Sequence, residues 1–81
     1  MQIRVLFHSY FKDLTGCADA RFDVETGATI ARLLDQVRGR FSKLEPMRKS
    51  TLVAVGVEYQ PGDYILQEAE EVSLFPPVQG G

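Results

Sequence analysis

The sequence predicts a small α+β domain in which a mixed β-sheet packs against one main helix. Three features predict it: apolar residues alternate near both ends of the chain, one amphipathic helical stripe lies near the middle, and a second β-type run follows the stripe. With 81 residues, the chain has room for one domain with a modest core. We expect the domain to span residues 1–75 and an extended C-terminal tail to span residues 76–81.

Two strands are expected before the helix. Ile3, Val5 and Phe7 alternate with residues that face the other way, so they mark the first strand and its core side. A second alternating segment covers residues 20–25. Between the two strands lies a short turn of helix or a loop that ends at Gly16, and this spacing favours an antiparallel pair.

The main helix is expected over residues 30–42. Thr29 is the expected N-cap because its hydroxyl can accept a hydrogen bond from a backbone N–H of the first turn. Gly39 inside the helix costs up to about 1 kcal/mol relative to Ala, so it indicates either an early end or a close packing contact. The apolar stripe recurs at spacings of three and four, as a core-facing helix requires, and consists of Ile30, Leu33, Leu34, Val37 and Phe41.

The second half of the chain is expected to supply the remaining strands. Residues 51–59 form a near-continuous β-type run, typical of one strand with neighbours on both sides. Residues 60–63 (QPGD) carry a type II turn signature, and Leu66 falls in a connecting loop. The last strand is expected at residues 71–75. A parallel pairing of this strand with the first would give the β-grasp arrangement, which periodicity alone does not establish.

The residue composition argues against several classes of function. The single cysteine, Cys17, allows no internal disulfide and fits a reducing compartment, so we expect a cytoplasmic protein. His8 is the only histidine, which argues against a histidine metal site or a Ser–His–Asp triad. No glycine-rich strand-to-helix loop for phosphate is present, and no apolar run approaches the roughly 20 residues of a membrane span.

Charge is distributed unevenly along the chain. Residues 1–49 hold all nine Lys and Arg residues against six acidic residues, whereas residues 50–81 hold five acidic residues and no basic one. One interpretation is an ordinary solvated acidic surface. The other is that the half bearing the tail is steered toward a basic protein partner. The basic half lacks interleaved exposed aromatic residues, which disfavours nucleic acid as the partner.

The C-terminal segment LFPPVQGG carries the most specific chemistry. Alternation places Phe75 on the sheet face away from the helix, where an aromatic residue is a candidate anchor for a partner. Pro76 and Pro77 cannot donate ladder hydrogen bonds and fix φ, so they end the sheet and favour an extended exit. Gly80 and Gly81 lack side chains, so they fit a channel that any Cβ would block.

A free carboxylate at Gly81 does not react at neutral pH, so it must first be activated, most simply as an acyl-adenylate formed from ATP. Because the chain has no nucleotide-binding loop of its own, the activating enzyme is expected to be another protein. We expect no intrinsically bound cofactor and no metal.

The chain resembles the ubiquitin-like sulfur carriers and, within them, the small subunits of molybdopterin synthase (MoaD type). The segments that carry the resemblance are VLFHSYFKDLTG, VAVGVEY and EEVSLFPPVQGG, and the ending F-P-P-V-x-G-G is the most specific of them. The chain departs from the family pattern at four positions that the resemblance associates with loops and the docking face, namely His8, Gly56, Ala69 and Glu70.

The resemblance implies a mechanism. Gly81 would be adenylated by an enzyme related to ubiquitin-activating enzymes, and a sulfur-donor protein would convert it to a thiocarboxylate. The terminal sulfur would attack cyclic pyranopterin monophosphate to build the molybdopterin dithiolene. Phe75, Tyr59 and His8 would dock on the partners, which include a large synthase subunit in a heterotetramer. The tail would enter a pocket of that subunit through Pro76, Pro77, Val78, Gln79 and Gly80.

Three alternatives remain open. The chain could carry sulfur for thiamine, cysteine or transfer-RNA thiolation. It could instead be a ubiquitin-like modifier that is conjugated to lysines through Gly81, or a plain interaction module in which Gly80 and Gly81 have no role.

Overall fold

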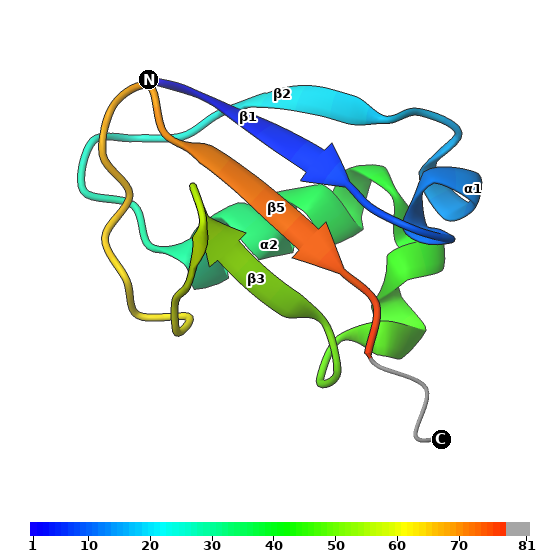
Figure 1. Cartoon of the computed structure of the whole chain (residues 1–81). Coiled ribbons are helices and arrows are strands. Elements are labelled where there is room, and N and C mark those ends of the chain that lie inside the picture. The colour runs from blue at the N-terminus through cyan, green and yellow to red at the C-terminus, as the bar shows by residue number, and fades with distance from the viewer. Residues whose placement is uncertain (78–81) are drawn as a thin grey trace.

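In the computed structural model, which describes residues 1–77, a five-stranded sheet is covered on one face by the longest helix (Figure 1). The elements, in chain order, are β1 (Gln2–Phe7), α1 (Phe11–Thr15), β2 (Asp19–Asp23), α2 (Ile30–Arg40), the 3₁₀ helix η1 (Ser42–Met47), β3 (Leu52–Val55), β4 (Glu58–Tyr59) and β5 (Glu71–Phe75).

The strands are ordered β2-β1-β5-β3-β4, so the two terminal strands lie side by side in the middle of the sheet (Figure 1). β1 and β5 run parallel, with Val5 beside Val72 and Phe7 beside Leu74. The other neighbours, β1–β2, β3–β5 and β3–β4, are antiparallel. This is the β-grasp arrangement, and it supplies the parallel pairing that periodicity left undecided.

The core lies between α2 and the sheet, and the predicted alternation is confirmed. Side chains from β1, β5 and α2 fill it, each at most 2% exposed: Ile3, Val5, Phe7, Ile30, Leu33, Val37, Val72 and Leu74. Leu66, in the loop before β5, is buried with them at 2% exposure. Leu34, by contrast, is only half-buried, because it faces the open side of α2 next to β3.

α2 begins and ends for identifiable reasons. The hydroxyl of Thr29 accepts a hydrogen bond from the N–H of Arg32 at 3.3 Å, which confirms the predicted N-cap. The helix ends at Arg40, two residues before the predicted end, because Phe41 leaves the helical region with φ −121° and ψ 78°. The Phe41 ring then packs edge-on against Phe7, with centroids 5.4 Å apart. A Cβ at Gly39 would meet nothing within 4 Å, so the glycine marks the early end and not a close contact.

The prediction of one strand over residues 51–59 is wrong, because this segment is the β3–β4 hairpin. Val55 pairs with Glu58, which leaves Gly56 and Val57 as a two-residue turn. Gly56 has φ +61°, a backbone conformation that other residues rarely adopt and that a primed hairpin turn requires at its first central position.

The type II turn predicted at residues 60–63 is also wrong. The N–H of Tyr64 donates to the carbonyl of Pro61 at 3.0 Å, so the turn starts one residue later, and Gly62 is absent from the glycines with positive φ. The physical reason is a tertiary contact: the carbonyl of Gly62 accepts from Ala31 N–H at 2.9 Å and that of Tyr64 accepts from Ile30 N–H at 3.0 Å. Both bonds tie the loop to the first turn of α2.

Candidate docking surface

The sheet face that points away from α2 carries apolar and aromatic residues near the C-terminal end of β5. Strand register places Leu6 beside Ser73 and Leu52 beside Phe75 on this face. Tyr59 lies beside Ala54, one strand further. His8 follows β1 and joins them because its N–H donates to the carbonyl of Leu74 at 3.1 Å, which extends the pairing. We call Leu6, His8, Leu52, Tyr59 and Phe75 the open-face cluster.

Phe75 is the centre of this cluster. Its ring stacks on His8, with centroids 4.3 Å apart and planes 11° apart, and meets Tyr59 edge-on at 6.3 Å. Tyr59 is 68% exposed and Leu52 is 37% exposed, so the cluster presents apolar area to solvent. The structure therefore brings together the three residues predicted to dock, although their docking role stays a prediction. Exposed aromatic side chains of this kind are the usual anchors of protein interfaces.

His8 has an unusual environment within the cluster. Its Nε2 atom is buried and has no hydrogen-bond partner in the described part of the chain. A buried polar atom without a partner costs about 1–3 kcal/mol. The stack on Phe75 places this nitrogen beside the last residue of β5, without a hydrogen-bond partner among residues 1–77.

A second part of the same face is charged, and sequence reasoning did not find it. Arg4 on β1 donates from Nε to Asp19 Oδ2 at 2.8 Å and from Nη1 to Glu71 Oε2 at 2.9 Å. These hydrogen bonds, that to Asp19 first, raise the pKa of Arg4 above its ordinary value, so the guanidinium stays charged. The three residues come from β1, β2 and β5, and the only sequence signal for the group is their common phase in three alternating strands.

The start of the predicted tail follows the cluster directly. β5 ends at Phe75, and Pro76 and Pro77 continue as half-buried residues outside any strand, so the predicted end of the sheet is confirmed. Val78, Gln79, Gly80 and Gly81 lie outside the described residues. Their predicted roles, and the division of the chain into residues 1–75 and 76–81, remain predictions.

The rest of the described chain, residues 1–77, shows no candidate metal site. Within residues 1–77, no three His, Cys, Asp or Glu side chains gather as a metal site. Cys17 is half-buried, with its Sγ 3.8 Å from the hydroxyl of Thr15. None of the helices between residues 1 and 77 combines the length and the apolar character that crossing a membrane would require.

The fold and the open-face cluster together define a ubiquitin-like β-grasp domain with a candidate protein-docking surface beside its C-terminal segment. Comparison with family models makes the assignment specific. The model described as "ThiS family" matches residues 5–81, and the chain therefore belongs to the ThiS family.

Curated relatives match over nearly the whole chain. A protein of Arabidopsis thaliana named "Molybdopterin synthase sulfur carrier subunit" is 31% identical over 81 residues, covering 100% of this chain and 84% of the relative. The Homo sapiens protein of the same name is 28% identical over 83 residues, covering 99% of this chain and 94% of the relative.

Solved structures confirm the fold. SAMP1 from Haloferax volcanii superposes with a TM-score of 0.88 at 24% identity, over 100% of both chains. A chain from the complex of subunits 1 and 2 of the molybdopterin-converting factor of Helicobacter pylori superposes with a TM-score of 0.68 at 18% identity, again over 100% of both chains. At these identities the likeness concerns the fold alone.

Proposed function

We propose that this chain is the sulfur-carrying small subunit of a molybdopterin synthase. The full-length similarity to relatives that bear this name carries the proposal, and the family match extends through Gly80 and Gly81. The open-face cluster supports it further, because a carrier that passes between proteins needs a recognition surface close to its reactive end.

The reacting group is the carboxyl group of Gly81. A carboxylate oxygen attacks the α-phosphorus of ATP on a separate activating enzyme, and pyrophosphate leaves. The terminal sulfur of a persulfide on a sulfur-donor protein then attacks the carbonyl carbon and displaces AMP. A second thiol of the donor cleaves the S–S bond of the resulting acyl disulfide, which leaves a terminal thiocarboxylate on Gly81 and a disulfide on the donor.

The thiocarboxylate sulfur is a far better nucleophile than oxygen and attacks a carbon of cyclic pyranopterin monophosphate on the large subunit, where it displaces an oxygen substituent and forms an acyl thioester. Water then cleaves the acyl C–S bond, so that the sulfur stays on the substrate and Gly81 returns as a carboxylate. Two such transfers complete the dithiolene.

This chain positions the terminal sulfur, and the large subunit supplies the acid–base and substrate-binding groups. Phe75, with His8 and Tyr59 against it, anchors the domain on its partner. Pro76 and Pro77 restrict the direction in which the last four residues leave the anchor. Residues 78–81 then enter the partner's pocket, where the bare backbone of Gly80 and Gly81 passes. Since the activating enzyme and the large subunit use the same end of the chain, they compete for it.

Deletion of Gly80 and Gly81 tests the proposal. The shortened protein is expected to lose all sulfur transfer in a reaction reconstituted with the large subunit, the activating enzyme, ATP and a sulfur donor. Its thermal unfolding midpoint is expected to change little, because the core residues lie between Ile3 and Leu74. Product formation at the wild-type rate would exclude Gly81 as the carrier group and favour the alternative of a plain interaction module.

A further inference from the structure

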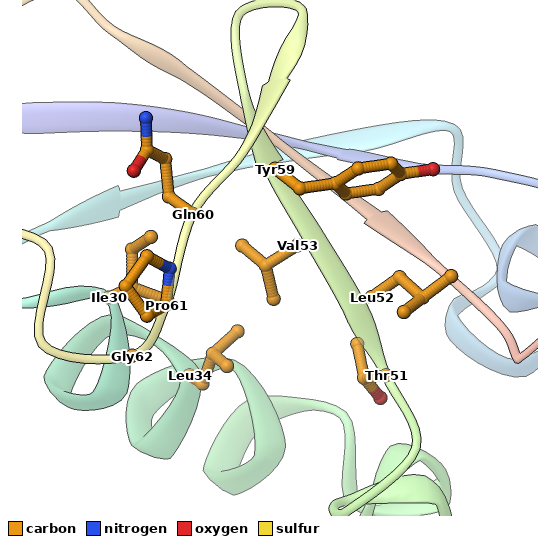
Figure 2. A pocket seen from close by; sticks show the side chains of 9 residues that line it. All are labelled: Ile30, Leu34, Thr51, Leu52, Val53, Tyr59, Gln60, Pro61 and Gly62. Atoms are coloured by element: carbon orange, nitrogen blue, oxygen red, sulfur yellow. The ribbon is translucent and has the colours of Figure 1, made fainter.

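An apolar groove runs along the sheet edge between α2 and the β3–β4 hairpin (Figure 2). Its volume is about 430 Å³. Ile30 and Leu34 of α2 form one wall, and Val53 of β3 lies between them and Tyr59, which overhangs the opposite side (Figure 2). Pro61 closes the end nearest the start of α2.

The β3 strand is only partly covered at this edge. β4 has two residues, which pair with Ala54 and Val55, and beyond them Gln60 N–H donates to the carbonyl of Val53 at 3.1 Å. Within residues 1–77, the N–H of Val53 and both backbone groups of Thr51 take part in no hydrogen bond. Alternation turns these groups toward the same side of the strand, away from β5. The edge therefore offers donors and an acceptor in the order that an added strand needs.

We propose that the groove receives an extended segment of the large subunit, which adds a strand to the free edge of β3 at Thr51–Val53. Alternate apolar side chains of that segment fill the groove over Leu34. Such strand addition combines main-chain hydrogen bonds with pockets for every second side chain. This inference rests on the proposed function, because it names how the same partner binds.

Continuity with the open-face cluster identifies the occupant as part of the same partner. Leu52 and Tyr59 line the groove and also belong to that cluster. A partner seated on Phe75 therefore reaches the groove without leaving the surface. Such a partner gains apolar contact on both sides of the β3–β4 hairpin.

The charge around the groove indicates which residues should flank the apolar positions of the bound segment. Glu58 and Asp63 are exposed next to the groove-lining residues Tyr59 and Gly62. Neither acid is a member of the ion pairs found among residues 1–77. We therefore expect Lys or Arg in the segment beside its apolar residues, as the acidic balance of residues 50–81 also favours.

Backbone amide exchange tests the proposal directly. NMR measures amide exchange in the full ¹⁵N-labelled chain, first in the free protein and then in its complex with the large subunit purified from the organism that produces this chain. The amides of Thr51 and Val53 are expected to exchange at least about tenfold more slowly in the complex than in the free protein. A complex that shifts the Phe75 and Tyr59 resonances but leaves these two exchange rates unchanged would overturn the inference while the proposed function stands.

A pair of variants in the groove wall provides a second readout. Leu34→Gln is expected to weaken the dissociation constant for the large subunit about tenfold, whereas the matched control Leu34→Met stays within about twofold of wild type. Both replacements favour helix and leave the open-face cluster intact, and thermal melting verifies that both variants fold. Equal affinities for the two variants would contradict a groove contact.

The same exchange data distinguish the other occupants, and each alternative overturns the inference. Protection of Val53 in the free protein that disappears when residues 78–81 are deleted would make the chain's own end the occupant. Protection that grows with protein concentration would make it a second copy of the chain. A large subunit that forms no complex at all would overturn the proposed function and this inference together.

Discussion

Phe75 links the sheet to the segment that carries the proposed chemistry. It is the last residue of β5, it is half-buried between His8 and Tyr59, and Pro76 follows it directly. Under the proposed function, this position would couple partner recognition to the direction in which the tail leaves the sheet. An aromatic residue held by two others loses little further freedom on binding, which suits an anchor.

Replacing Phe75 with Ala is expected to weaken binding to the large subunit at least about tenfold, because the central contact of the surface is removed. Isothermal titration calorimetry measures the dissociation constant. Val57→Ala is the matched control, since Val57 is 98% exposed at the hairpin tip and its loss should change the constant less than about twofold. Equal losses in the two variants would show that Phe75 is not an anchor for the large subunit.

The buried Nε2 atom of His8 is expected to lower the stability of the free domain. Replacing His8 with Phe keeps an aromatic ring on Phe75 and removes the buried Nε2 atom that lacks a partner in the described chain. We expect the free energy of unfolding to rise by about 1 kcal/mol, measured by urea denaturation. His8→Ala, which also removes the stack, should not show this gain. A less stable Phe variant would mean that Nε2 is satisfied in solution.

At the scale of elements, the loop between β4 and β5 is fixed by its own hydrogen bonds. The hydroxyl of Tyr64 donates to Glu70 Oε2 at 2.7 Å, and the N–H of Gln67 donates to Glu70 Oε1 at 2.6 Å. The N–H of Leu66 donates to the carbonyl of Ala28 at 2.9 Å, which ties the loop to the residues before α2. One carboxylate thus organises the segment that leads into β5.

The hydrogen bond between Tyr64 and Glu70 in this loop predicts that the stability of the fold decreases at alkaline pH. The hydrogen bond to Glu70, aided by partial desolvation, raises the pKa of Tyr64 above its ordinary value of 10.0. Because the folded state holds the phenolic proton more tightly than the unfolded state, this stability is complete below pH 10 and is lost as the pH rises through the folded pKa. Tyr64→Phe should therefore be less stable at neutral pH and lose less stability above pH 10. Urea denaturation from neutral to alkaline pH checks this, and parallel curves would contradict it.

The elements that the sequence predicts correctly are those whose signals are local. Alternation defines β1, β2 and β5, and the stripe with Thr29 as N-cap defines the start of α2. The sequence does not predict the β3–β4 hairpin, because Gly56 and Val57 lie inside an uninterrupted apolar run. A glycine followed by one residue between two strand-like pairs was the available signal.

For the molecule as a whole, the unpredicted features depend on contacts between residues distant in sequence. Periodicity cannot pair β1 with β5, and so it could not bring Arg4 to Asp19 and Glu71. The free edge of β3 likewise follows from the shortness of β4. A prediction of one strand over residues 51–59 contains neither a separate β4 nor this edge. By contrast, alternation alone predicts Phe75 as a docking candidate, whereas the docking roles of Tyr59 and His8 are predicted from the family resemblance.

The central claim is that the carboxyl group of Gly81 carries sulfur, and the intact mass of the protein purified from its native cells tests it most directly. We predict a species in which one oxygen has been replaced by one sulfur, located at Gly81 by fragmentation and lost on incubation with the large subunit and cyclic pyranopterin monophosphate. A protein with only an unmodified carboxylate, or a ladder of heavier conjugates to other proteins, would contradict the account.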